Sequence, residues 1–129
     1  GEGNAFCRKM FESVGSTVYV PEKDFDAVTC VSGSGPAYVF YFIKAMTEGG
    51  IANGLSPEVA KSLTLATVAG ACKLAEMSDD SLDTLIDKVC SKGGTTIQAI
   101  DAFRNANMDK VVIDGMTACR RRSEELGKA

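Results

Sequence analysis

The chain has 129 residues, of which 45% are hydrophobic and 24% charged, and its formal net charge is −3 at pH 7. This length and composition fit one folded globular chain and leave no room for a large multi-domain enzyme. The absence of histidine excludes an imidazole general base, the usual catalytic triad and any zinc site that needs histidine. The slightly negative charge excludes a basic surface that would attract nucleic acid or an anionic membrane.

The beginning of the chain predicts one helix followed by one strand. Residues 4–14 place apolar side chains on one helical face, and Gly15 stands where a left-handed cap would end that helix. Thr17 to Val20 is a β-branched and aromatic run closed by Pro21. Because a lone strand cannot satisfy its own backbone groups, we expect these residues to end a sheet domain. A short edge strand on a helical domain is the alternative.

From Asp24 onward, every pattern in the sequence is helical. A short helix over Phe25–Val31 leads into a break at Ser32–Gly35, and Pro36 takes the favoured first position of the next helix. That helix is apolar on every side over residues 37–43. Such a pattern predicts a helix that is buried all round.

A second apolar helix begins at Ser56, as N-cap, and Pro57. It has no charge between Lys61 and Lys73 and is rich in alanine and glycine. The apolar surface of two such helices is larger than the core of one small chain normally encloses. The sequence therefore predicts a partner chain that covers the excess apolar surface.

Three further helices complete the predicted mostly-α bundle. The first is amphipathic and runs from about Ser81 to Cys90. The second is opened by Thr95, which with Gln98 three residues later has the pattern of a capping box. The last starts near Asp109 and ends at Gly127.

The best local candidate for a site is the segment 91–96, Ser-Lys-Gly-Gly-Thr-Thr. Two glycines directly before a helix let the backbone approach a ligand closely, and the free amides and helix dipole favour an anion. A carboxylate or a phosphate would fit there. An ordinary turn between two helices remains the alternative at this point.

The other candidate features are weaker. Ser32–Pro36 lacks the third glycine of a dinucleotide fingerprint and has no strand before it, which favours a tight corner between helices. We expect Glu48 to be a solvated acid near a helix end, and Arg120–Arg122 to be a solvated face or, at most, a rim of ion pairs at an interface. Cys90, beside the glycine loop, is expected to serve packing.

The five cysteines are widely spaced, odd in number and form no Cys-x-x-Cys pair. This pattern predicts reduced and mostly buried thiols in a cytoplasmic protein. The longest uncharged stretch of helical character, residues 62–72, is shorter than the roughly 18 residues that cross a bilayer. The start at Gly1 rather than methionine favours a fragment or a processed chain.

Taken together, three segments resemble the C-terminal domain of the pyrroline-5-carboxylate reductases. They are residues 26–38 with the Ser-Gly-Ser-Gly-Pro-Ala-Tyr run, Glu48–Gly50, and Gly93–Ile97. Their order and spacing match the family, and the similarity covers essentially the whole chain. The resemblance implies a mostly α helical bundle that intertwines with a second subunit. Residues 1–22 would then be the terminal helix and strand of a Rossmann domain, and residues 23–129 the dimerisation and substrate-binding domain.

The function that the resemblance implies is reduction of 1-pyrroline-5-carboxylate to L-proline, the last step of proline biosynthesis. NADPH or NADH would be bound mainly by the N-terminal domain, so this chain alone is expected to be inactive. The cofactor-binding residues are unknown and no metal is expected. The implied partners are a second copy, or a larger ring of copies, and the small-molecule substrate, with neither nucleic acid nor membrane.

The family's substrate loop maps onto Ser91, Gly94, Thr95 and Thr96. Thr96 is implied as the catalytic residue, with its hydroxyl hydrogen-bonding near the ring nitrogen of the substrate. The family usually has proline before the two glycines, and Lys92 replaces it here. The loop therefore lacks a fixed φ angle and carries a cation beside the expected anion site.

Two alternatives remain open from the sequence. A non-catalytic helical dimerisation module would keep the apolar helices and dispense with the site at Gly94–Thr96. A dehydrogenase relative with the same two-domain plan could act on another small carboxylate. Such a relative is expected to carry a catalytic lysine or histidine in its helical domain, and the chain has no histidine.

Overall fold

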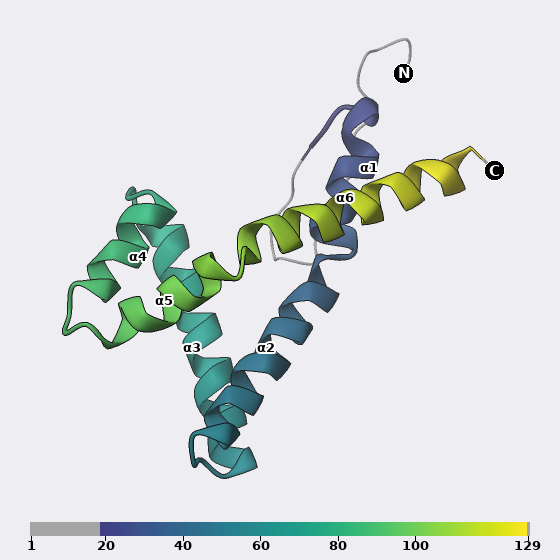
Figure 1. Ribbon diagram of the computed structural model, residues 1–129. Helices are drawn as coiled ribbons and strands as arrows, with labels where there is room; N and C mark the ends of the chain where they lie inside the picture. The colour runs from purple at the N-terminus through teal and green to yellow at the C-terminus, as the bar shows by residue number, and fades with distance from the viewer. Residues whose placement is uncertain (1–18, 129) are drawn as a thin grey trace. The chain divides into compact units, whose positions relative to one another are not determined.

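A computed structural model describes residues 19–128 of the chain, shown in Figure 1. Within this range all regular structure is helical, as predicted, and no strand is present. The elements in chain order are η1 (a 3-10 turn, Glu22–Asp24), α1 (Phe25–Val28), η2 (a π-helical turn, Thr29–Gly33), α2 (Gly35–Ala52), α3 (Pro57–Met77), α4 (Leu82–Cys90), α5 (Thr95–Asn105) and α6 (Met108–Gly127).

The helix and strand predicted before Pro21 fall almost entirely outside the described residues. Of the predicted strand Thr17–Val20, only Tyr19 and Val20 are described, and both lie in neither helix nor strand. The described chain divides into two compact units. One consists of residues 40–108, and the other joins the residues up to 39 with those from 109 onward.

Within residues 40–108, α2 and α3 form a close helical hairpin. Gly50, near the end of α2, lies so close to α3 that an added Cβ would stand 3.1 Å from the Cβ of Ala60. Ala60 is only 2% exposed. The Ser56 hydroxyl accepts a hydrogen bond from the Val59 amide at 3.2 Å and Pro57 follows it, which confirms the predicted start of α3.

The same unit contains the pair of helices that frames the candidate site. Ser81 caps α4, because its hydroxyl accepts a hydrogen bond from the Thr84 amide at 3.1 Å. α4 and α5 contact each other. The observed starts of α4 and α5 lie within one residue of the predicted starts.

In the other unit, α6 is hydrogen-bonded to the first turns of the domain. The Ser123 hydroxyl donates to the Asp26 carboxylate at 2.6 Å, and the Cys119 thiol donates to the Ser34 hydroxyl at 3.3 Å. The predicted break at Ser32–Gly35 begins too early, since the chain continues as the π turn η2 through Gly33. The Ser34 amide ends that turn by donating a hydrogen bond to the Thr29 carbonyl at 2.8 Å.

The prediction that α2 is buried on every side is wrong for this chain by itself. Phe40 is 69% exposed and Tyr41 78%, and on α3 Leu74 is 67% exposed. The prediction of mostly buried thiols is also wrong, since Cys30 alone is buried among the four described cysteines and Cys72 is exposed. Both errors have the same cause: among the described residues, the helices of one chain do not enclose these side chains.

Candidate functional site

The segment between α4 and α5 is held by its backbone and leaves its side chains exposed. The Ser91 amide donates to the Asp87 carbonyl at 2.9 Å, and the Lys92 amide donates to the Val89 carbonyl at 3.2 Å. The next two residues adopt left-handed conformations, with φ of +125° at Gly93 and +82° at Gly94. No atom lies within 4 Å of a Cβ built at either glycine, so the backbone conformation, not crowding, favours glycine here.

The first turn of α5 is not capped by a side chain, which corrects the predicted capping box. Gly94 rather than Thr95 is the N-cap residue, and no side-chain cap hydrogen bond is present. The left-handed conformation of Gly94 shifts the start of the helix by one residue. Thr95 therefore lies inside the first turn, and Gln98 has no N-cap hydroxyl to complement. The first amides of α5 remain available to an external acceptor.

The four predicted substrate residues lie at the end of α4 and the start of α5. Ser91 is the C-cap of α4, Gly94 is the N-cap of α5, and Thr95 and Thr96 are the first two residues of α5. Thr95 is exposed, whereas Thr96 is half-buried at the second position of α5. The Ser91 hydroxyl donates to the Lys88 carbonyl at 3.0 Å, which holds Ser91 as the cap of α4 while its oxygen can still accept a hydrogen bond. A small anion at this helix start could therefore meet backbone donors and threonine hydroxyls together.

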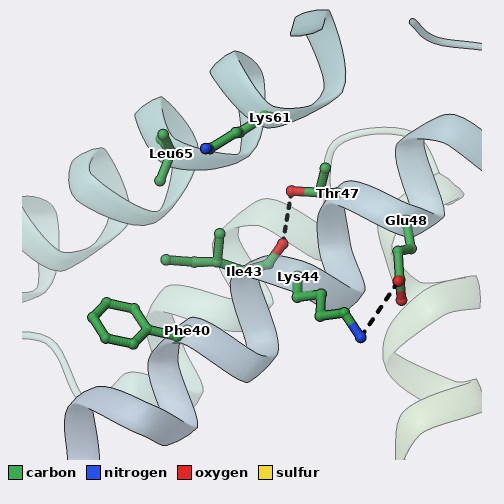
Figure 2. A pocket seen from close by; sticks show the side chains of 7 residues that line it. All are labelled: Phe40, Ile43, Lys44, Thr47, Glu48, Lys61 and Leu65. Atoms are coloured by element: carbon green, nitrogen blue, oxygen red, sulfur yellow. Dashed lines mark hydrogen bonds and ion pairs between the residues drawn. The ribbon is translucent and has the colours of Figure 1, made fainter. Parts of the chain in front are cut away.

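A second feature of the same unit is a groove of about 490 Å³ between α2 and α3. Its lining residues are Phe40, Ile43, Lys44, Thr47, Glu48, Lys61 and Leu65. Figure 2 shows Phe40, Ile43 and Leu65 along its apolar part and the Lys44–Glu48 ion pair to one side. That pair has a nitrogen–oxygen distance of 3.6 Å and is mostly exposed, so the prediction of Glu48 as a solvated acid is confirmed.

The other unit holds a polar cluster that sequence reasoning missed. The Tyr38 hydroxyl donates to the Cys30 carbonyl at 2.8 Å. A hydrogen bond with Cys119 and burial raise the pKa of Tyr38 to about 12, while hydrogen bonds with Ser34 and Tyr38 lower the pKa of Cys119. The Ser34 and Cys119 positions are 85 residues apart, and no local pattern links positions that distant.

The weaker candidates of the sequence have ordinary structural roles. Ser32–Pro36 forms the corner from η2 into α2, as predicted, and follows a π turn rather than a strand. Arg120 pairs with Glu124 at 2.8 Å and Arg122 with Glu125 at 3.0 Å, both within α6. Arg121 and Arg122 are exposed, as expected for a solvated face.

The residues that the structure describes contain neither a cluster of metal ligands nor the strand–glycine–helix arrangement of a dinucleotide fingerprint. No group of three or more cysteine, aspartate and glutamate side chains there could hold a metal ion. The glycine segments at 33–35 and 93–94 do not follow a strand, so they lack the context of that fingerprint. Across residues 19–128, no helix has the length and apolar character to cross a membrane.

Comparison with protein families gives a match over most of the chain. Residues 22–126 match the family model described as "Pyrroline-5-carboxylate reductase dimerisation". The matched range includes both the α2–α3 groove and the loop before α5.

Individual relatives agree with this match. The pyrroline-5-carboxylate reductase of Synechocystis sp. is 42% identical over 124 residues, which cover 96% of this chain and 46% of that protein. The structure of a pyrroline-5-carboxylate reductase from Coxiella burnetii aligns with a TM-score of 0.83 and 38% identity, over 88% of this chain and 42% of that one. That of Plasmodium falciparum pyrroline carboxylate reductase with NADP bound aligns with a TM-score of 0.81 and 34% identity, over 84% and 44%. The chain thus spans about half the length of the relatives it matches.

Proposed function

Since this chain belongs to the pyrroline-5-carboxylate reductase family, we propose that it is the helical domain of an enzyme that reduces 1-pyrroline-5-carboxylate to L-proline. The observation that carries the proposal is the uncapped start of α5 behind two left-handed glycines, in a chain with this family match. The boundary with a preceding dinucleotide domain, near residue 22, is part of the proposal.

The proposed role of the loop is to bind and orient the substrate carboxylate. The carboxylate would accept hydrogen bonds from the uncapped backbone amides at the start of α5, with the Thr95 hydroxyl and the Ser91 oxygen as further partners, at the positive end of the helix. Fixing the carboxylate fixes the ring, and with it the carbon of the C=N bond that accepts a hydride. Orientation is then the main catalytic contribution of these residues.

We assign Thr96 the position nearest the reacting bond. Thr96 is half-buried, whereas Thr95 is exposed. Loss of a hydrogen bond made by a partly desolvated hydroxyl costs more free energy than loss of one made by a solvated hydroxyl. The Thr96 hydroxyl would hydrogen-bond near the ring nitrogen, which gains a proton as the adjacent carbon is reduced. The hydride would come from NADPH or NADH bound mainly outside this chain, since no glycine segment among the described residues follows a strand.

The test is substitution of Thr96 in the complete reductase polypeptide that carries these residues. Thr96→Ala should lower kcat/KM for 1-pyrroline-5-carboxylate by about 5- to 150-fold, equivalent to about 1–3 kcal/mol. Thr96→Ser is the matched control, because it keeps the hydroxyl, and it should retain most activity. Equal kcat/KM for wild type and Thr96→Ala would remove Thr96 from the site. Lack of any reduction by the wild-type polypeptide would favour a non-catalytic dimerisation module.

We also propose that the exposed apolar faces of α2 and α3 pack against a second copy of the chain. The groove between these helices is lined by Phe40, Ile43 and Leu65, and the charges of Lys44, Glu48 and Lys61 stand at its edge. An apolar centre with a polar rim is the usual composition of a protein–protein interface. The side chains of Phe40 and Tyr41, which one chain leaves exposed, would gain their burial there.

A charge within the small-residue stretch of α3 tests this interface. Ala69 is exposed in the single chain, and Ala69→Glu would place an unpaired carboxylate in the apolar contact. Sedimentation should show the variant shifted to monomer at concentrations where wild type is a dimer or a larger assembly. Asp79→Lys, at an exposed and already charged position between α3 and α4, is the control and should leave the assembly intact. An unchanged assembly in Ala69→Glu would refute the placement of α3.

A cytoplasmic location completes the proposal. The four described cysteines are free thiols, and thiols persist in the reducing cytoplasm.

A further inference from the structure

Two cysteines lie where α6 meets the first turns of the domain. The Ser123 hydroxyl donates to the Asp26 carboxylate at 2.6 Å. The Cys119 thiol donates to the Ser34 hydroxyl at 3.3 Å. Cys30 lies between these two contacts, four residues after Asp26 and four before Ser34, and is only 8% exposed. The fold therefore brings Cys30 and Cys119 to one contact region, although the whole of α2 to α5 separates them in the sequence.

The hydroxyl of Tyr38 connects the two cysteines. It donates a hydrogen bond to the Cys30 carbonyl at 2.8 Å, and it also hydrogen-bonds with the Cys119 side chain. Both thiols interact electrostatically with this hydroxyl. Because the carbonyl oxygen and the sulfur of one cysteine are only a few bond lengths apart, both sulfur atoms lie near the Tyr38 oxygen.

The surroundings of the two thiols differ. Cys119 is half-buried, and its hydrogen bonds with the hydroxyls of Ser34 and Tyr38 lower the pKa of its thiol. Cys30 is buried, and its thiol donates to the Ala27 carbonyl at 3.1 Å. A partly accessible cysteine with hydroxyl donors for its thiolate, next to a second cysteine, is the arrangement found in redox-sensitive pairs.

We propose that Cys119 and Cys30 form a reversible disulfide when the protein meets a hydroperoxide. The Cys119 thiolate attacks one oxygen of the peroxide, the O–O bond breaks, and a sulfenic acid forms while the other oxygen leaves with a proton. The Cys30 sulfur then attacks the sulfenic sulfur. The S–S bond forms, the S–O bond breaks, and water leaves. The two thiols lose two electrons, which the peroxide gains, and small cellular thiols reverse the reaction by exchange.

The disulfide fastens α6 to the first turns of the domain. It closes a loop that contains α2 to α5, and a cross-link over a long loop restricts the unfolded chain most. In the reduced protein, the described contacts between these segments include the hydrogen bonds of Ser123 and Cys119. The redox state of the pair therefore controls how easily α6 separates from Asp26 and Ser34. This device is independent of the proposed reduction of 1-pyrroline-5-carboxylate.

The first experiment maps the disulfide in the complete reductase polypeptide. Reduced protein is treated with hydrogen peroxide, the remaining thiols are alkylated, and its peptides are identified by mass spectrometry without reduction. We expect a peptide pair joined through Cys30 and Cys119 that dithiothreitol separates. Absence of this pair after peroxide treatment, or linkage of Cys119 to another cysteine instead, would overturn the inference. This measurement needs no variant, so it does not depend on the folding of one.

Serine variants separate the two steps. In Cys30→Ser the sulfenic acid on Cys119 has no second thiol to react with, so dimedone should label Cys119. In Cys119→Ser, Cys30 should stay reduced. Cys90 is the internal control, because it is half-buried like Cys119 and no hydroxyl among residues 19–128 hydrogen-bonds with it. Equal rates of peroxide oxidation at Cys90 and Cys119 would contradict the assignment of Cys119 as the reacting thiol.

Two further measurements test the roles of the hydroxyl and of the covalent link. Tyr38→Phe removes a donor to the thiolate, so alkylation of Cys119 at neutral pH should slow by about 3- to 10-fold while Cys90 is unchanged. Peroxide should raise the urea midpoint of the wild-type protein by roughly 1–2 M at a fixed protein concentration. It should not raise the midpoint of Cys30→Ser. Equal midpoints for oxidised and reduced wild type would refute the fastening of α6.

Discussion

The close approach of α2 and α3 at Gly50 gives a prediction whose size follows from the geometry. A Cβ at residue 50 would lie 3.1 Å from the Ala60 Cβ and 3.4 Å from Cδ1 of Leu55. Leu55 can rotate, but Ala60 is buried and has no flexible side chain, so α3 itself must move. Such overpacking costs about 1–3 kcal/mol, whereas replacing a helical glycine by alanine gains about 1 kcal/mol.

The matched control is the preceding residue. Nothing lies within 4 Å of a Cβ at Gly49, so Gly49→Ala should keep the gain without the clash. We expect Gly50→Ala to be about 1–3 kcal/mol less stable than Gly49→Ala. Equilibrium urea unfolding at one fixed protein concentration measures the difference, because association contributes to the apparent stability.

A double-mutant cycle separates this contact from any effect of a partner chain. Ala60→Gly removes the atom that the new Cβ would meet, so Gly50→Ala should cost less in an Ala60→Gly background. We expect a coupling free energy of about 1 kcal/mol or more between the two positions. A coupling near zero would refute the argument that these two backbones are in contact.

Two further predictions concern the caps and the polar cluster. Ser56→Ala should lower the free energy of unfolding by about 1 kcal/mol, since the Val59 amide loses its acceptor; Ser56→Asp keeps an acceptor and should be close to wild type in the same urea experiment. The pKa of Tyr38, raised from 10.0 to about 12, means that the folded state holds this proton more tightly than the unfolded state. Its contribution to stability is thus fully present below pH 10 and is lost as the pH rises toward 12. A tyrosinate absorbance titration should show a late phase that Tyr38→Phe abolishes, and identical curves for the two proteins would contradict the assignment.

The features that the sequence predicted correctly depend on neighbouring residues. Ser56 and Pro57 identified the start of α3 because a cap is formed by a side chain and an amide only three residues away. The start of α5 was misplaced by one residue, because the left-handed conformation of Gly94 is not specified by the Thr95–Gln98 pattern.

The features that could not be predicted depend on distant residues or on another chain. Cys119 and Ser34 are brought together by the fold across 85 positions, and neither residue type indicates the other. The apolar pattern of α2 predicts a covered helix. It could not show that this chain leaves Tyr41 exposed, because the pattern is the same whichever chain covers it. The loop at 91–96 could be proposed as a site from the sequence because its glycines and threonines are contiguous.

The hydrogen bonds between α6 and the first turns of the domain also affect the order in which its parts fold during synthesis. Asp26 is translated 97 residues before its partner Ser123, so the unit that contains both cannot close until nearly the whole domain has been made. Residues 40–108 form a compact unit without either end, and their hairpin contacts are local. On the ribosome, we therefore expect the α2–α5 region to fold first, with its apolar faces still uncovered, while the first turns wait for the last helix.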